Sequence, residues 1–225
     1  MSSLSIQQKR ISSVLKLIVI ISAILGTCLS AYAGRQSFMG GTRVFMYFTI
    51  QSNLALAVIS CIGLFLMRNA KSNPSRCWQI IKFVGTVSIT LTGMVFCFVL
   101  APTLGDKAWN VHNVLTHVVV PVASVADFFV IGRVINLKKS STCFNIIPPL
   151  LYAIYAGIGY VRGWEFAEGA NYPYFFLNWG SPAGAFGFTS ELPFMGSAWW
   201  ILVLFCFLLL VGLLYLKINE KCNHK

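Results

Sequence analysis

Six long apolar stretches are the feature that most constrains this chain. A bilayer hydrocarbon core about 30 Å thick is crossed by roughly 20 helical residues, since each residue rises about 1.5 Å. Stretches of this length predict spanning helices at residues Val14–Ala33, Val44–Leu66, Trp78–Ala101, Val111–Ile135, Asn145–Arg162 and Ser197–Leu216. The expected fold is therefore all-α: a polytopic membrane protein whose six-transmembrane-helix bundle forms a single integral membrane domain, residues 1–225.

Composition excludes a water-soluble domain. Hydrophobic residues make up 57% of the chain and charged residues only 10%, whereas about a quarter of the residues of a soluble domain are charged. In a soluble protein the formal net charge of +11 would suggest a nucleic-acid partner. In so apolar a chain we expect no nucleic acid as partner, because the positions of basic residues report membrane orientation instead.

The basic residues divide unequally between the two ends of the predicted spans. Four lie on the side opposite the N-terminus, namely Arg35, Arg43, Lys107 and Arg162. The other thirteen are Lys9, Arg10, Lys16, Arg68, Lys71, Arg76, Lys82, Arg133, Lys138, Lys139, Lys217, Lys221 and Lys225. Because loops rich in Lys and Arg stay in the cytoplasm, the N-terminus and the C-terminus are both predicted to be cytoplasmic.

The connection between the fifth and sixth predicted spans, Gly163–Gly196, is unusually long and aromatic. At more than thirty residues it exceeds the usual length of a connection without structure, and such loops are commonly lids or binding loops. Two interpretations stay open. The aromatic residues can form a belt at the lipid headgroups, or the loop can be a partly re-entrant cap over a cavity that opens outward.

Polar residues inside spans mark helix contacts or functional sites. In the second span, Thr49, Ser52 and Asn53 follow the i, i+3, i+4 spacing of one helix face, while Gln51 points elsewhere. In the fourth span His117 follows one turn after Asn113, which can orient its ring. Both groups can also be ordinary interhelical hydrogen bonds.

The predicted depths of Thr49 and His117 in the membrane favour one site that contains both residues. Thr49 lies about five residues into its predicted span and His117 about six, which places them roughly 8 and 9 Å below the outer ends. The two side chains can therefore meet. Asp127 is about 15 Å deeper than His117 and cannot complete a triad, so we expect it to pair with Arg133 or with a helix end.

A hydroxyl beside an imidazole has the form of an activated nucleophile and its base. Thr49 and His117 are accordingly the candidate catalytic residues. The candidates for binding substrate, or for donating to a developing oxyanion, are Gln51, Ser52, Asn53, Asn113, Tyr172 and Tyr174. The cysteines form no C-x-x-C pair, and we expect neither a metal nor a cofactor.

Three segments together resemble a bacterial family of predicted six-helix membrane proteins: residues Tyr47–Asn53, His117 with Pro121 and Asp127 after it, and Tyr172–Asn178. That family is distantly similar to the androgen-induced-protein family of transmembrane threonine hydrolases. The resemblance implies a bacterial cell (inner) membrane protein that cleaves fatty-acid esters of hydroxy fatty acids. It also implies that Thr49 is the nucleophile and His117 the base.

Two other functions remain open. The same polar residues can recognise a lipid headgroup in a non-enzymatic lipid-binding or small-molecule transport protein, although the chain has no evident repeat or pair of broken helices. A scaffold without a polar cavity at Thr49 is the third. A membrane lipid is the expected substrate or ligand, and the sequence leaves the oligomeric state undetermined.

Overall fold

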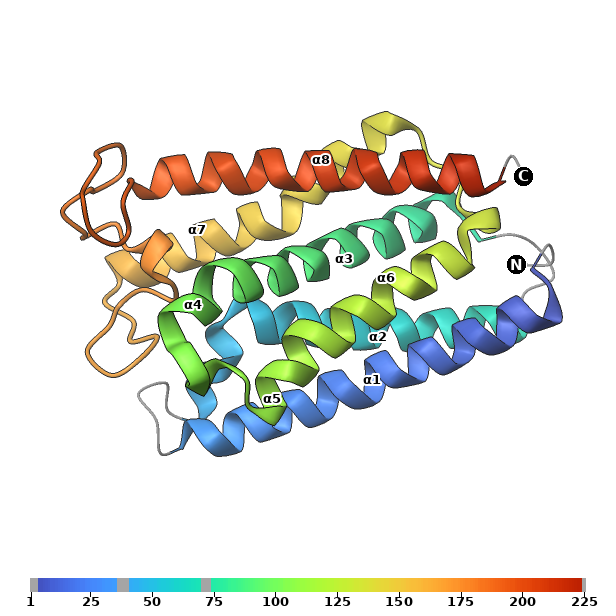
Figure 1. Cartoon of the computed structure of the whole chain (residues 1–225), viewed down its shortest axis with the longest axis horizontal. Helices are drawn as coiled ribbons and strands as arrows, with labels where there is room; N and C mark the ends of the chain where they lie inside the picture. Colours follow the sequence, from blue (N-terminus) through green and yellow to red (C-terminus); the bar gives the residue numbers. More distant parts are fainter. Residues whose placement is uncertain (1–3, 36–40, 70–73, 224–225) are drawn as a thin grey trace.

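The chain folds into an all-α bundle (Figure 1) in a computed structural model that describes residues 4–35, 41–69 and 74–223. Within these residues, six segments are long and apolar enough to cross a membrane, which is the architecture of an integral membrane protein. The helices are α1 Ile6–Gly34, α2 Phe48–Asn69, α3 Arg76–Val95, α4 Ala101–Leu104, α5 Val111–Val114, α6 Val120–Val130, α7 Ile147–Val161 and α8 Ser197–Asn223.

Within the described residues, two of the spans contain a π-helical turn between shorter helical pieces. The third continues from α3 through a π-helical turn, Phe96–Leu100, into α4. The fourth consists of α5, a second π-helical turn at Leu115–Val119, and α6. A π turn inserts one extra residue into a helix and changes the direction in which the following side chains point.

The predicted spans overlap the observed helices, with differences at their ends. Helix α1 starts at Ile6, well before the predicted start, because Ser5 and Gln8 form a reciprocal capping box at its N-terminus. The second span does not begin at Val44. Residues Thr42–Met46 form a 3₁₀ turn and Tyr47 has extended backbone, so helix α2 starts only at Phe48.

Helices α1, α2, α3 and α6 form the closely packed part of the bundle. Helix α3 packs against α2, α6 and α8, while α7 and α8 do not approach each other closely along their main chains. The start of α1 and the end of α8 lie at one end of the molecule, and the connection between α7 and α8 lies at the other (Figure 1).

Asp127 lies in a buried charge cluster and not beside Arg133, so the predicted pairing was wrong. Lys16 Nζ contacts both carboxylate oxygens at 2.6 and 2.8 Å, and Lys82 Nζ lies 2.7 Å from Oδ2. Ser12 donates to Oδ1 at 2.5 Å. Arg133 is exposed, whereas the two lysines are 1% exposed, because their long side chains reach inward from α1 and α3.

Candidate active site

Thr49 is the second residue of α2, and this position differs from the one predicted for it. Because the helix starts at Phe48 and not at Val44, Thr49 lies at a helix N-terminus instead of five residues inside a span. The first N–H groups of a helix have no partner within it, and the positive end of the helix dipole lies there. The Thr49 N–H donates to the Tyr174 hydroxyl at 3.4 Å.

His117 meets Thr49 across the bundle. Its Nε2 lies 3.3 Å from Thr49 Oγ1, although the two residues are 68 positions apart in the chain. The imidazole is buried, with 8% of the residue exposed, whereas Thr49 is partly buried. The contact joins the start of α2 to the π turn Leu115–Val119.

The other ring nitrogen of His117 fixes which nitrogen carries the proton. Its Nδ1 lies 3.1 Å from the Asn113 carbonyl and 3.0 Å from Thr116 Oγ1. Since the Thr116 hydroxyl donates to the His112 carbonyl at 2.9 Å, its oxygen is left to accept. Two acceptors around Nδ1 place the proton there, and the lone pair of Nε2 then faces the Thr49 hydroxyl.

The imidazole is also held by stacking. The Phe96 ring lies parallel to it, with 3.9 Å between ring centroids and 20° between planes. Phe96 opens the π turn of the third span and His117 lies in the π turn of the fourth. Two π turns that place adjoining residues at one contact are typical of a functional site, where such turns are frequent.

Two glycines let the neighbouring helices approach this contact. A methyl group at Gly26 of α1 would lie 2.6 Å from Thr116 Cγ2. One at Gly93 of α3 would lie 2.8 Å from the His117 carbonyl oxygen. Both separations are too short for a real side chain. Thr116 and the main chain of His117 can therefore approach α1 and α3 this closely only because glycine stands at these two positions.

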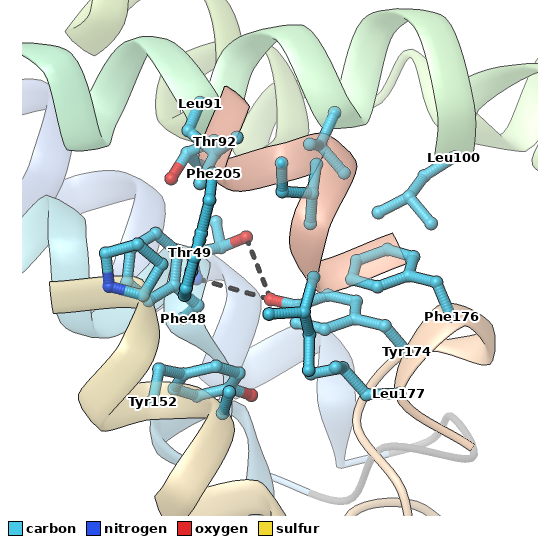
Figure 2. A pocket seen from close by; sticks show the side chains of 15 residues that line it. Phe48, Thr49, Leu91, Thr92, Leu100, Tyr152, Tyr174, Phe176, Leu177 and Phe205 are labelled. Atoms are coloured by element: carbon cyan, nitrogen blue, oxygen red, sulfur yellow. Dashed lines mark hydrogen bonds between the residues drawn. The ribbon is translucent and has the colours of Figure 1, made fainter. Parts of the chain in front are cut away.

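Tyr174, from the connection between α7 and α8, reaches the same hydroxyl. Its Oη lies 3.5 Å from Thr49 Oγ1, and Figure 2 shows the phenol pointing at Thr49 from the opposite wall. Burial raises the pKa of the Tyr174 phenol above its usual range. The phenol therefore stays protonated and can donate a hydrogen bond to an oxygen that becomes negative beside Thr49.

The connection is fastened over the start of α2. The Tyr47 hydroxyl donates to the Phe166 carbonyl at 3.1 Å, and an ion pair joins Arg43 to Glu165. Tyr47, Phe166 and Phe176 belong to one buried aromatic cluster. This part of the loop thus packs into the end of the bundle.

An apolar pocket begins at Thr49. Figure 2 shows the side chains that surround it. The lining residues are Phe48, Thr49, Leu91, Thr92, Val95, Leu100, Pro149, Tyr152, Ala153, Tyr174, Phe176, Leu177, Ile201, Leu204 and Phe205. His117 is not among them, so Thr49 stands between the imidazole and the pocket.

The remaining candidates lie around this contact with other partners. Asn53 donates to the Thr49 carbonyl at 2.8 Å and to the Thr116 carbonyl at 3.1 Å, which links α2 to the fourth span. Ser52 bonds Thr92 at 3.0 Å. The exposed Gln51 donates to the Phe45 carbonyl. Asn113 turns its amide to the Ala108 carbonyl, so its main chain and not its side chain orients His117. Tyr172 is partly buried in the loop.

Sequence reasoning missed Phe96 and the positioning role of Thr116. Thr116 had a signal, because a threonine next to the histidine and four residues after His112 can bond to that carbonyl. Phe96 had none, since its approach depends on the π turn of the third span. Within the described ranges, no group of three or more His, Cys, Asp or Glu side chains is placed to hold a metal ion.

Comparisons with known proteins add no relative to this description. No family model, curated protein or solved structure matches the chain.

Proposed function

We propose that this protein is an intramembrane lipid-ester hydrolase with Thr49 as nucleophile and His117 as general base. The observation that carries the proposal is the 3.3 Å approach of Nε2 to Thr49 Oγ1, with Nδ1 occupied by two acceptors. A nucleophile and base within hydrogen-bond reach, with the base oriented by a third group, is the general signature of covalent acyl transfer. Here the third group is main chain and a neighbouring hydroxyl instead of a carboxylate.

The reaction would proceed in two steps. Thr49 Oγ1 attacks the ester carbonyl carbon while His117 Nε2 takes the hydroxyl proton. When the tetrahedral intermediate collapses, His117 returns that proton to the leaving alcohol and an acyl-threonine remains. Water then attacks the acyl carbon, His117 takes a proton from it, and the carboxylic acid departs as Thr49 regains its hydrogen.

The oxyanion formed in both steps has donors at hand. The Thr49 N–H lies at the positive end of α2, and the Tyr174 hydroxyl lies 3.5 Å from the nucleophilic oxygen. Donors that are fixed before the reaction stabilise developing charge most where water is excluded. Tyr174 is therefore the preferred oxyanion donor among the predicted candidates.

The substrate is a membrane lipid ester. The pocket beside Thr49 is lined mostly by apolar side chains, and the family resemblance suggests fatty-acid esters of hydroxy fatty acids. By the same resemblance and the distribution of basic residues, the protein belongs in a bacterial inner membrane with both termini cytoplasmic. The site then lies in the half of the membrane away from the cytoplasm.

A lipid-binding or transport protein is the second candidate. The polar groups on the pocket wall, Thr49, Thr92, Tyr152 and Tyr174, are suited to holding a lipid hydroxyl or carbonyl without any reaction. This function does not need the lone pair of His117 to face Thr49. Loss of the imidazole therefore separates the two candidates.

Hydrolysis of a long-chain ester by the purified protein in detergent or nanodiscs tests the proposal. Thr49→Ala and His117→Ala are each expected to abolish turnover and labelling by a fluorophosphonate probe while the protein remains folded. Thr27→Ala is the matched control, because Thr27 is also buried and its hydroxyl has no partner. Undiminished labelling of Thr49→Ala would end the proposal, and ligand binding without turnover in the wild type would favour the second candidate.

A further inference from the structure

The walls of the pocket differ in how closely their elements pack. At the end, Tyr47 bonds Phe166, and the Tyr152 hydroxyl donates to the Met46 carbonyl at 3.0 Å, which ties the loop, α7 and the start of α2 together. On the far side of Thr49 stands the buried ring of His117. The third span closes another wall through the buried Leu91 and Thr92. The remaining wall is shared by α7 and α8, whose main chains do not pack closely.

That remaining wall is partly exposed. Pro149 and Ala153 of α7 and Ile201, Leu204 and Phe205 of α8 all line the pocket, and each is neither buried nor fully exposed. The adjacent positions on both helices face outward, where Ile154 and Leu202 are each 52% exposed. In a spanning segment an outward apolar side chain faces lipid. The gap between α7 and α8 therefore faces the lipid chains and not water.

The chemistry of the lining restricts what can enter. None of the lining side chains is charged. The hydroxyl-bearing residues lie on α2, α3, the loop and one face of α7, whereas α8 contributes only hydrocarbon and aromatic groups. A guest that enters between α7 and α8 would meet hydrocarbon first and the Thr49 hydroxyl last.

From this arrangement we infer that the gap between α7 and α8 is a lateral entrance, through which the uncharged acyl chain of a lipid passes directly from the membrane to Thr49. Ala153 and Phe205 flank the entrance as positioning residues for that chain. Ala153 is the smallest side chain in the pocket lining, so the entrance is narrowed most by enlarging it. The inference rests on the proposed function for its kinetic test, but chain binding in the entrance is independent of hydrolysis.

The kinetic test compares Ala153→Trp with Ile154→Trp, its neighbour that faces outward. Ala153→Trp is expected to lower kcat/KM for a sixteen-carbon acyl ester by about tenfold or more relative to the acetate ester. Ile154→Trp is expected to leave that ratio unchanged, and Phe205→Ala to favour the long ester. Equal loss for both esters in Ala153→Trp, with the fluorophosphonate labelling and thermal unfolding of the wild type retained, would overturn the inference. An equal fall in the ratio of kcat/KM for the long ester to that for the acetate ester in Ala153→Trp and Ile154→Trp would also overturn it.

A binding test stays valid when no ester is cleaved. Thr49→Ala protein in nanodiscs is irradiated with an ester of a diazirine-bearing sixteen-carbon fatty acid, and the adducts are mapped by mass spectrometry. We expect adducts on α7 and α8 at the pocket-lining positions, and their loss in the Thr49→Ala, Ala153→Trp double variant. Adducts spread evenly over outward-facing positions such as Ile154 and Leu202 would overturn the entrance. Absence of turnover in the wild type with adducts at the lining would refute only the hydrolase.

Discussion

Two buried polar clusters share the fourth span and differ in what surrounds them. The first is the site, Thr49 with His117, and the second is the charge cluster, Lys16 and Lys82 around Asp127. The site carries no ion pair, is built on π turns and a helix N-terminus, and borders an apolar pocket. The charge cluster is built on regular helix, and none of its members lines that pocket. Buried polarity alone therefore does not identify a functional site.

The difference lies in which hydrogen-bonding groups remain available. In the charge cluster the carboxylate of Asp127 is surrounded by Ser12, Lys16 and Lys82, so it connects α1, α3 and α6 and has no oxygen free for a guest. In the site the His117 lone pair faces a hydroxyl that itself faces open space. We expect substitutions in the charge cluster to change stability and substitutions in the site to change activity.

The largest expected effect on folding is that of Asp127→Asn. It leaves two buried ammonium groups without a carboxylate, and removing one partner of a buried ion pair lowers the free energy of unfolding by about 3 to 5 kcal/mol. Thermal unfolding in detergent measures the change. Thr49→Ala is the comparison, with a change expected below about 1 kcal/mol. If both variants unfold at the wild-type temperature, the charge cluster does not hold the bundle together.

Tyr174→Phe is expected to lower activity and to leave stability nearly unchanged, in contrast to Asp127→Asn. The loss of one donor to an oxyanion lowers kcat by about a hundredfold, or about 2.7 kcal/mol, while the ring and its packing stay. Tyr172→Phe is the matched control, because Tyr172 lies in the same loop and has no hydrogen bond to Thr49 or His117. Equal rates in the two variants would remove Tyr174 from the mechanism. Steady-state kinetics with one ester are sufficient.

A smaller effect is expected from Gly26→Ala. The new methyl group would lie 2.6 Å from Thr116 Cγ2, and the displacement passes to the His117 ring through its bond to Thr116. A misplaced base lowers the rate by about tenfold. Gly157→Ala, where the nearest atom is 3.9 Å away, should leave the rate unchanged. A wild-type rate in both alanine variants would show that the Thr116 contact does not position the base.

Hydropathy was sufficient to locate the spans. Because successive spans cross the membrane in opposite directions, counting residues from the outer ends of the second and fourth spans was sufficient to predict that Thr49 and His117 lie at one level. The length of an apolar stretch is a property of the chain itself, and spanning requires that length. The reason given for the depth of Thr49 was nevertheless wrong, because α2 starts at Phe48. Residues 44–46 are apolar enough to continue a span but belong to a 3₁₀ turn instead.

Other parts of the site depend on packing that no local pattern specifies. The two π turns have no sequence signature, and the approach of Tyr174 depends on how a long loop folds back over α2. The partners of Asp127 come from α1 and α3, far away in the chain, so the nearby Arg133 was a poor guide. A contact between two helices depends on how both of them pack, and no local pattern in the sequence specifies that packing.

Mapping the fluorophosphonate adduct tests the central claim most directly. Wild-type protein in nanodiscs is labelled, digested and sequenced by mass spectrometry. If Thr49 is activated by His117, the adduct lies on Thr49 in the wild type and is lost in His117→Ala, whereas Thr27→Ala keeps it. An adduct on any other residue, or one on Thr49 that persists in His117→Ala, would contradict the account.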